Sequence, residues 1–178
     1  MREVDEAFEQ FVRDRSAHLI RLALLLTGQN RAEAEDLLQI ALERAYRKRN
    51  SLRRDSTPEP YVRKVLVNCA IDRHRWLRRT GERPLTMADD VPAPGDLIGV
   101  LDERDALIRS LSRLPPRQRA VLVLRYWEDM PEDLIASTLG CSPGTVRSQV
   151  SRGLARLRQE TSAPVEAAAS AEGMTSTE

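Results

Sequence analysis

A segment near the C-terminal end of the chain contains three small or apolar side chains whose spacing is typical of a tight helical turn. Ala136, Gly140 and Val146 follow one another at intervals of four and six residues. Two closely crossing helices need a small residue at the crossing, a glycine for the left-handed turn, and an apolar side chain that fixes the second helix. Ser142 and Pro143 suit the N-cap and the first turn of that second helix. The segment is therefore predicted to be a helix-turn-helix.

The outward face of the predicted second helix carries small and hydrogen-bonding side chains together with two arginines. These side chains suit a helix that lies in the major groove of DNA, where they contact base edges and phosphates. An ordinary helical hairpin, which also favours glycine in its turn, is the alternative interpretation. The candidate DNA-contacting residues are Gly144, Thr145, Arg147, Ser148, Ser151 and Arg152.

A second group of candidate residues lies in a basic block. The chain has a net charge of only +1, but residues 44–79 contain 12 basic and 3 acidic side chains. This block indicates binding to a polyanion such as nucleic acid, although a solvated arginine-rich helix has the same composition. Five polar residues share one helical face and two arginines lie in the preceding loop (47–57), where they can line a path for phosphates and an unpaired base. They are Lys64, Asn68, Asp72, Arg75 and Arg79 on the helix, and Arg53 and Arg54 in the loop.

A third candidate surface is the polar side of an amphipathic helix that starts after Asn30. Apolar residues recur at helical spacing from Ala34 to Tyr46 and form the side that faces the core. The polar residues outside this stripe form a partly acidic surface, which suits a partner with basic side chains. A solvated surface is the alternative. The residues concerned are Glu35, Asp36, Gln39 and Glu43.

These segments all require helices, and the chain is predicted to be all-α. Helical periodicity groups residues 5–79 and 101–160 into two small domains, and no strand-like alternation occurs. Residues 80–100 contain several prolines and glycines and are predicted to be a flexible linker. Residues 161–178 are small and polar and are predicted to be a disordered tail.

Two expectations concern the packing of the second domain. A helix over about 102–114 is expected to turn Leu107 inward, and a pair of prolines separates it from the next helix. The run of residues 120–127 is nearly all apolar, so it is expected to form a fully buried helix.

The composition excludes several classes of protein. No apolar run approaches the roughly 18 residues of a membrane span, and the N-terminus lacks the pattern of a secretory signal. Cys69 and Cys141 cannot make a disulfide framework or a four-ligand zinc site, and His18 and His74 have no partners at ligand spacing. No catalytic constellation is present. We therefore expect a cytoplasmic protein that is not an enzyme and uses no cofactor or metal.

Several longer motifs resemble a known family. LPPRQRAV (114–121), RYWED (125–129) and CSPGTVRSQVSRG (141–153) are similar to the sigma-four domain of a bacterial RNA polymerase sigma factor. AEDLLQIALERAY (34–46) resembles the sigma-two helix that binds the polymerase clamp, and YVRKVLVNCAIDRHR (61–75) resembles the promoter-melting helix that follows it. Two such domains with a short linker match the extracytoplasmic-function (ECF) class.

The resemblance implies a role for each candidate surface. It assigns the helix-turn-helix to the minus-thirty-five promoter element, and the polar face of residues 34–46 to the coiled-coil clamp of the largest polymerase subunit. It assigns the basic loop and helix, with Tyr61, to the melted minus-ten element. Tyr61 and Trp76 are the nearby aromatic candidates for a wedge between bases, and Trp76 also fits the inner face of its helix.

The predicted function is that of a promoter-specificity subunit that binds core RNA polymerase and promoter DNA. An anti-sigma protein is a common partner for this class. The alternative is a stand-alone helix-turn-helix regulator, which would need residues 116–158 but not the polar face of residues 34–46. A helical enzyme with an appended DNA-binding domain is a third interpretation, which the missing catalytic residues disfavour.

Overall fold

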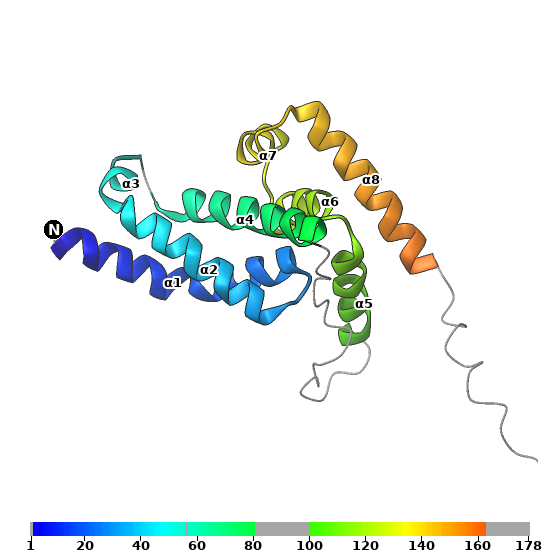
Figure 1. Ribbon diagram of the computed structural model, residues 1–178, viewed down its shortest axis with the longest axis horizontal. Coiled ribbons are helices and arrows are strands. Elements are labelled where there is room, and N and C mark those ends of the chain that lie inside the picture. The colour runs from blue at the N-terminus through cyan, green and yellow to red at the C-terminus, as the bar shows by residue number, and fades with distance from the viewer. Residues whose placement is uncertain (1, 56, 81–99, 163–178) are drawn as a thin grey trace, which may run out of the picture.

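The computed structural model describes residues 2–55, 57–80 and 100–162, and within these ranges all regular secondary structure is helical, as predicted (Figure 1). Most of the predicted linker, residues 81–99, and most of the predicted tail, residues 163–178, lie outside the described residues. Their predicted ends need correction, because Thr80 and Val100 belong to helices and the last helix continues to Ser162.

The first half of the molecule contains four helices. They are α1 (Arg2–Thr27), α2 (Arg31–Arg47), α3 (Arg49–Asp55) and α4 (Glu59–Thr80). Gly28, with φ of +68°, ends α1 in the left-handed conformation, and the side chain of Asn30 caps α2 by accepting a 3.0 Å hydrogen bond from the Glu33 amide. α2 lies along α1, and α4 packs against both (Figure 1).

The segment between α2 and α4 differs from the prediction. Residues 47–57 were expected to be a loop because they break the apolar period, but Arg49–Asp55 form α3. Arg49 is fixed by its surroundings: Nε donates to Asp5 at 2.6 Å, and the guanidinium lies 3.9 Å from the centre of the Tyr46 ring. Tertiary contacts therefore stabilise a short helix that lacks an apolar stripe of its own.

The second half comprises a further series of helices. They are α5 (Val100–Arg113), α6 (Pro116–Leu122), a π-helical turn η1 (Val123–Trp127), α7 (Glu132–Leu139) and α8 (Pro143–Ser162). Pro115 and Pro116 separate α5 from α6, as predicted. Leu107 on α5 is about half exposed rather than inward.

The apolar run of residues 120–127 is only partly buried. Residues up to Leu124 are in the core, but Tyr126 and Trp127 are 62% and 42% exposed, so the expectation of a fully buried helix was wrong. The cause is the π-helical turn, closed by a hydrogen bond from the Glu128 amide to the Val123 carbonyl. An extra residue in this turn shifts the following side chains around the helix axis.

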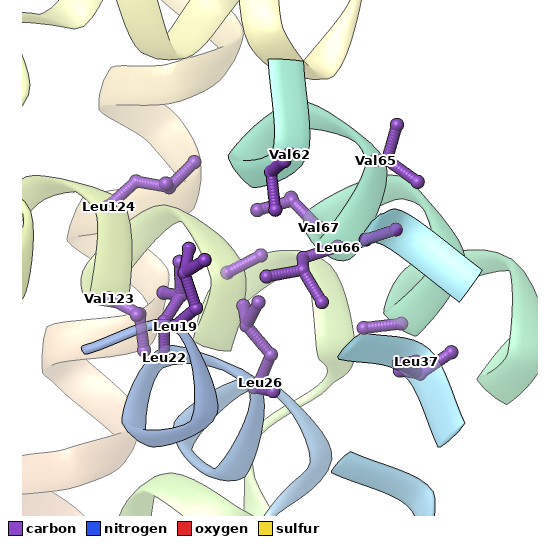
Figure 2. Close-up of a cluster of buried hydrophobic side chains, with 14 of the residues drawn as sticks. Leu19, Leu22, Leu26, Leu37, Val62, Val65, Leu66, Val67, Val123 and Leu124 are labelled. Atoms are coloured by element: carbon purple, nitrogen blue, oxygen red, sulfur yellow. The ribbon is translucent and has the colours of Figure 1, made fainter. Parts of the chain in front are cut away.

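One apolar core extends through both halves. Leu22 of α1, Val62 and Leu66 of α4, and Leu124 of η1 are completely buried and belong to a single cluster. Figure 2 shows Leu22 beside Val123, with the α4 side chains next to them. The two predicted domains are therefore packed against each other in this structure.

A buried arginine crosses the boundary between the halves. Arg119 of α6 donates hydrogen bonds of 3.2 Å to the carbonyl oxygens of Leu26, at the end of α1, and Leu114. Burial lowers the pKa of the Arg119 guanidinium to about 10, and the nearby carboxylate of Glu33 opposes that shift. Gly28 leaves the space that the guanidinium fills, because a Cβ there would lie 2.6 Å from Arg119 Nη1.

This contact predicts different costs for two glycine substitutions. Gly28→Ala and Gly140→Ala both force alanine into the left-handed conformation, which costs about 1–2 kcal/mol. Only Gly28→Ala also displaces a buried guanidinium, because no atom lies within 4 Å of the Cβ position at Gly140. We expect Gly28→Ala to lower the free energy of unfolding by about 1–3 kcal/mol more than Gly140→Ala does. Urea denaturation followed by circular dichroism measures both, and equal losses would contradict the role of Arg119.

Candidate nucleic-acid interface

The helix-turn-helix has the predicted local geometry. Gly140 ends α7 with φ of +63°, and its amide donates to the Ala136 carbonyl. Ser142 caps α8, because its hydroxyl accepts a 3.1 Å hydrogen bond from the Thr145 amide. Ala136 and Val146 are buried where the two helices cross. The three key residues of the sequence pattern therefore have the structural roles expected of them.

The outward face of α8 divides into two kinds of residue. Gly144, Arg147, Ser151 and Arg152 are exposed. Thr145 and Ser148 are half-buried, and their hydroxyls are used locally: Thr145 Oγ1 lies 3.0 Å from the Ser142 hydroxyl, and Ser148 donates to the Thr145 carbonyl at 2.9 Å. The exposed residues are therefore the ones directly available to a DNA groove.

The inner face of α8 contains a residue that sequence reasoning missed. Gly153 is buried, and a Cβ at this position would lie 2.9 Å from Leu122 Cδ1 on α6. The glycine thus allows α8 to approach α6 closely. A glycine inside a helix signals such a close approach, because its intrinsic helix propensity is poor.

A second missed residue is Glu132 at the start of α7. Its carboxylate lies 3.7 Å from the Arg147 guanidinium on the exposed face of α8. The ion pair joins the two helices of the motif and reduces the positive charge that Arg147 presents. The spacing of residues within one helix cannot reveal an ion pair between two helices, because the turn that joins the helices sets the distance between the two side chains.

The basic face of α4 is only partly available to a ligand. Lys64, Asp72, Arg75 and Arg79 are exposed, and Asn68 is half-buried. Asp72 lies 3.5 Å from Arg75, so one acid partly neutralises one of the arginines.

The two aromatic residues of α4 that are candidates for base stacking differ in exposure. Tyr61 is half-buried, with Lys48 Nζ 5.2 Å from its ring centre, whereas Trp76 is 51% exposed and is therefore not a core residue. Arg53 and Arg54 lie in α3 rather than in a loop, which corrects the prediction, and their side chains are outside the described part.

The polar face of α2 borders a shallow apolar groove between α1 and α2. The floor of the groove includes Phe8 and Tyr46, whose ring centres are 5.5 Å apart. Glu35, Gln39 and Glu43 line its edge, while Asp36 is exposed and lies outside the lining. Glu35 and Glu43 pair with arginines of the same helix: Arg31 at 2.8 Å and Arg47 at 2.5 Å respectively.

Cys69 has the environment of an unreactive thiol. Cys69 is half-buried, and burial raises the pKa of its thiol, which disfavours the reactive thiolate. Among the residues that the structure describes, no cluster of three or more histidine, cysteine or acidic side chains is arranged to hold a metal ion. None of the described helices is long and apolar enough to cross a membrane.

Comparison with known proteins identifies the family. A family model for Sigma-70 region 2 matches residues 11–80, and one for Sigma-70 region 4 matches residues 104–157. The RNA polymerase sigma-E factor of Streptomyces coelicolor is 38% identical over 153 residues, which cover 86% of this chain and 85% of that relative. The chain belongs to the sigma-70 family of RNA polymerase sigma factors.

Other relatives place this sigma factor in the ECF class. The ECF RNA polymerase sigma factor SigM of Mycobacterium tuberculosis is 36% identical, with 85% of this chain and 75% of the relative covered. A solved structure of the sigma factor RpoE in complex with the anti-sigma factor NepR from Bartonella quintana superposes with a TM-score of 0.68. It is 26% identical, and the match covers 86% of this chain and 96% of that one. The predicted resemblance is confirmed, and the match to region 2 disfavours a stand-alone regulator.

The exposed arginines of α8 lead to a prediction for this sigma factor. Arg147→Ala and Arg152→Ala should each weaken binding to the upstream promoter element, by about 1–3 kcal/mol where the arginine reads a guanine edge. A contact to phosphate alone would instead weaken all promoters alike and reduce the salt dependence. Arg156→Ala, an exposed position farther along α8, is the matched control. Footprinting of the polymerase complex measures the effect, and unchanged footprints for both variants would remove α8 from the groove.

Proposed function

We propose that the N-terminal half of α8 reads the minus-thirty-five element of the promoter. The exposed residues of its outward face are small or donate hydrogen bonds. On its inner face, Gly153 lets α8 pack closely against Leu122 of α6, which fixes the position of the helix. A helix with these properties suits the major groove, where arginine recognises guanine and short side chains allow close approach to the backbone.

In the same proposal, α4 and α3 bind the minus-ten element as its strands separate. Lys64, Arg75 and Arg79 supply exposed positive charge for phosphates. Tyr61 and the exposed Trp76 supply aromatic surfaces on which an unpaired base can stack. Asn68 and Asp72 add hydrogen-bonding groups on the same helix face, and Arg53 and Arg54 belong to the adjoining α3.

Core RNA polymerase is proposed to dock on α2. The groove between α1 and α2 combines an apolar floor with the acidic and amide side chains of Glu35, Gln39 and Glu43. An apolar centre with a charged edge is the usual composition of a protein interface. A basic coiled-coil clamp on the largest polymerase subunit complements it, and Asp36 extends the acidic surface beyond the groove.

The protein is proposed to act by binding alone, in the cytoplasm where polymerase and promoters meet. It would supply no catalytic group, cofactor or metal, and the polymerase would carry out the chemistry. An anti-sigma protein is the natural class of regulatory partner, because the sigma factor RpoE from Bartonella quintana was solved in complex with one.

The observation that carries the proposal is the order of the two sigma regions in one chain, each with most of its predicted polar residues exposed. Run-off transcription with purified core polymerase is the direct test. Added sigma factor should produce transcripts of defined length from a dependent promoter, and core polymerase alone should not. Tight binding to a promoter duplex without polymerase, together with no stimulation of transcription, would contradict the proposal.

The docking surface can be tested with a double substitution. Asp36→Arg with Gln39→Ala reverses one charge and removes an amide on the exposed side of α2, so the fold should change by about 0.5 kcal/mol or less. Repulsion of a basic clamp should then abolish polymerase binding and transcription from every dependent promoter together. Glu9→Arg with Gln10→Ala makes the same chemical change at exposed positions of α1 and serves as the control. Normal polymerase affinity of a folded Asp36→Arg, Gln39→Ala variant would exclude this surface.

A further inference from the structure

The ion pair between Glu132 and Arg147 joins the two helices of the helix-turn-helix on its exposed side. Glu132 Oε2 lies 3.7 Å from Arg147 Nη1, and the two side chains are 35% and 69% exposed respectively. Arg147 belongs to the face of α8 that is proposed to enter the major groove, so the carboxylate of Glu132 lies beside that groove as well. Exposed ion pairs contribute little to stability. The consequence of this pair therefore lies in what it does to DNA binding.

Glu132 is held in position by the fold and not by the ion pair itself. The Pro131 carbonyl accepts hydrogen bonds of 3.1 and 3.0 Å from the amides of Leu134 and Ile135, which close the first turn of α7. Ile135 and Ala136 are buried and attach this end of α7 to the body of the protein. The backbone of Glu132 is therefore fixed relative to α8, and only its side chain has to be ordered to meet Arg147.

The pair brings two charges together without using the hydrogen-bonding groups of either side chain. Its 3.7 Å separation exceeds the about 2.7–3.2 Å of a hydrogen bond. Within the part of the chain that the structure describes, neither side chain makes a hydrogen bond. The planar fork of the Arg147 guanidinium thus remains available for the two acceptors at the edge of a guanine. Arg152, on the same face, is exposed and has no acidic side chain within ion-pair distance among the described residues.

An arginine with an acidic neighbour distinguishes bases from phosphates better than a free arginine does. A phosphate attracts a guanidinium through its full negative charge, and a nearby carboxylate weakens that attraction because it repels the phosphate. The acceptors of guanine carry only partial charges, so hydrogen bonds to them are weakened less. The carboxylate therefore acts against incorrect contacts more than against the correct one, and such a difference raises specificity.

We propose that Glu132 is a specificity-determining residue of promoter recognition, which positions Arg147 and favours its contact with a guanine edge over contact with phosphate. The inference rests on the proposed function, because it takes α8 as the helix that reads the minus-thirty-five element. It adds a residue of α7 to the residues that determine promoter preference. Glu132 acts through Arg147, so its contribution should vanish when the arginine is absent.

The test measures discrimination between promoters by the full chain bound to core polymerase. Equilibrium competition gives the affinities for a dependent promoter and for its single base-pair variants in the minus-thirty-five element. Arg147→Ala identifies the base pair that Arg147 reads, because discrimination falls there. At this base pair, Glu132→Gln should lower the ratio of matched to mismatched affinity by roughly three-fold or more, chiefly because mismatched promoters bind more tightly. The slope of log affinity against log salt should steepen by up to about 0.9, the value for one additional phosphate contact.

Asp133→Asn is the matched control, because it removes the same charge from an exposed residue in the first turn of α7. It should leave the affinity ratio unchanged. Glu132→Gln should have no further effect in an Arg147→Ala background, but should keep its effect in an Arg152→Ala background. A purely structural role of Glu132 would act equally in both backgrounds. Glu132→Ala also removes the carboxylate and serves if circular dichroism shows that Glu132→Gln alters the fold.

Two results would overturn the inference while leaving α8 in the groove. One is equal discrimination by the Glu132→Gln and Asp133→Asn variants at a base pair that Arg147→Ala affects. The other is an effect of Glu132→Gln that persists undiminished in the Arg147→Ala background. If Arg147→Ala changes discrimination at no base pair, the proposed role of Arg147 in base reading is contradicted, and the inference about Glu132 fails with it.

Discussion

The guanidinium of Arg119 is buried between helices that come from both halves of the molecule, and its charge must be accommodated there. It donates one hydrogen bond to the Leu26 carbonyl in the last turn of α1 and one to the carbonyl of Leu114, which follows α5, with Glu33 nearby. The last carbonyls of a helix have no partners within it, so Arg119 supplies a donor to the buried Leu26 carbonyl. The end of α1, the turn at Gly28 and the start of α6 are positioned together as a result.

The sequence predicted the helices best where periodicity, caps and turns agreed. α2 has a clean apolar stripe, an asparagine cap and a preceding glycine, and α7 and α8 follow from the spacing around Gly140. Prediction failed where tertiary contacts determine local structure. α3 has no stripe of its own, and the π-helical turn gives no signal in the apolar run that contains it, so the exposure of Tyr126 and Trp127 was missed.

The candidate surfaces were predictable as sets of residues, but their partners inside the protein were not. The helical period places Asp36, Gln39 and Glu43 on one polar surface of α2. The structure adds a groove that is lined by Gln39 and Glu43 together with Glu35 and that leaves Asp36 outside. The pairing of Glu132 with Arg147, and of Glu128 with Arg63 and His18, depends on how separate helices are placed in space. No regular spacing along the chain records such contacts. The packing of the two halves was missed for the same reason, because a boundary drawn from composition does not show what packs across it.

The division of α8 into a buried and an exposed side has a consequence for how this protein can change. Val146 and Gly153 fix the helix to the body of the molecule, while Gly144, Ser151 and Arg152 contribute nothing to that attachment. Under the proposed function, stability and target choice are therefore encoded on different sides of one helix. If α8 reads the promoter as proposed, substitutions on the exposed side should redirect the protein to a different set of genes while the fold that presents them stays intact. A library confined to those positions is then a direct route to new promoter preferences.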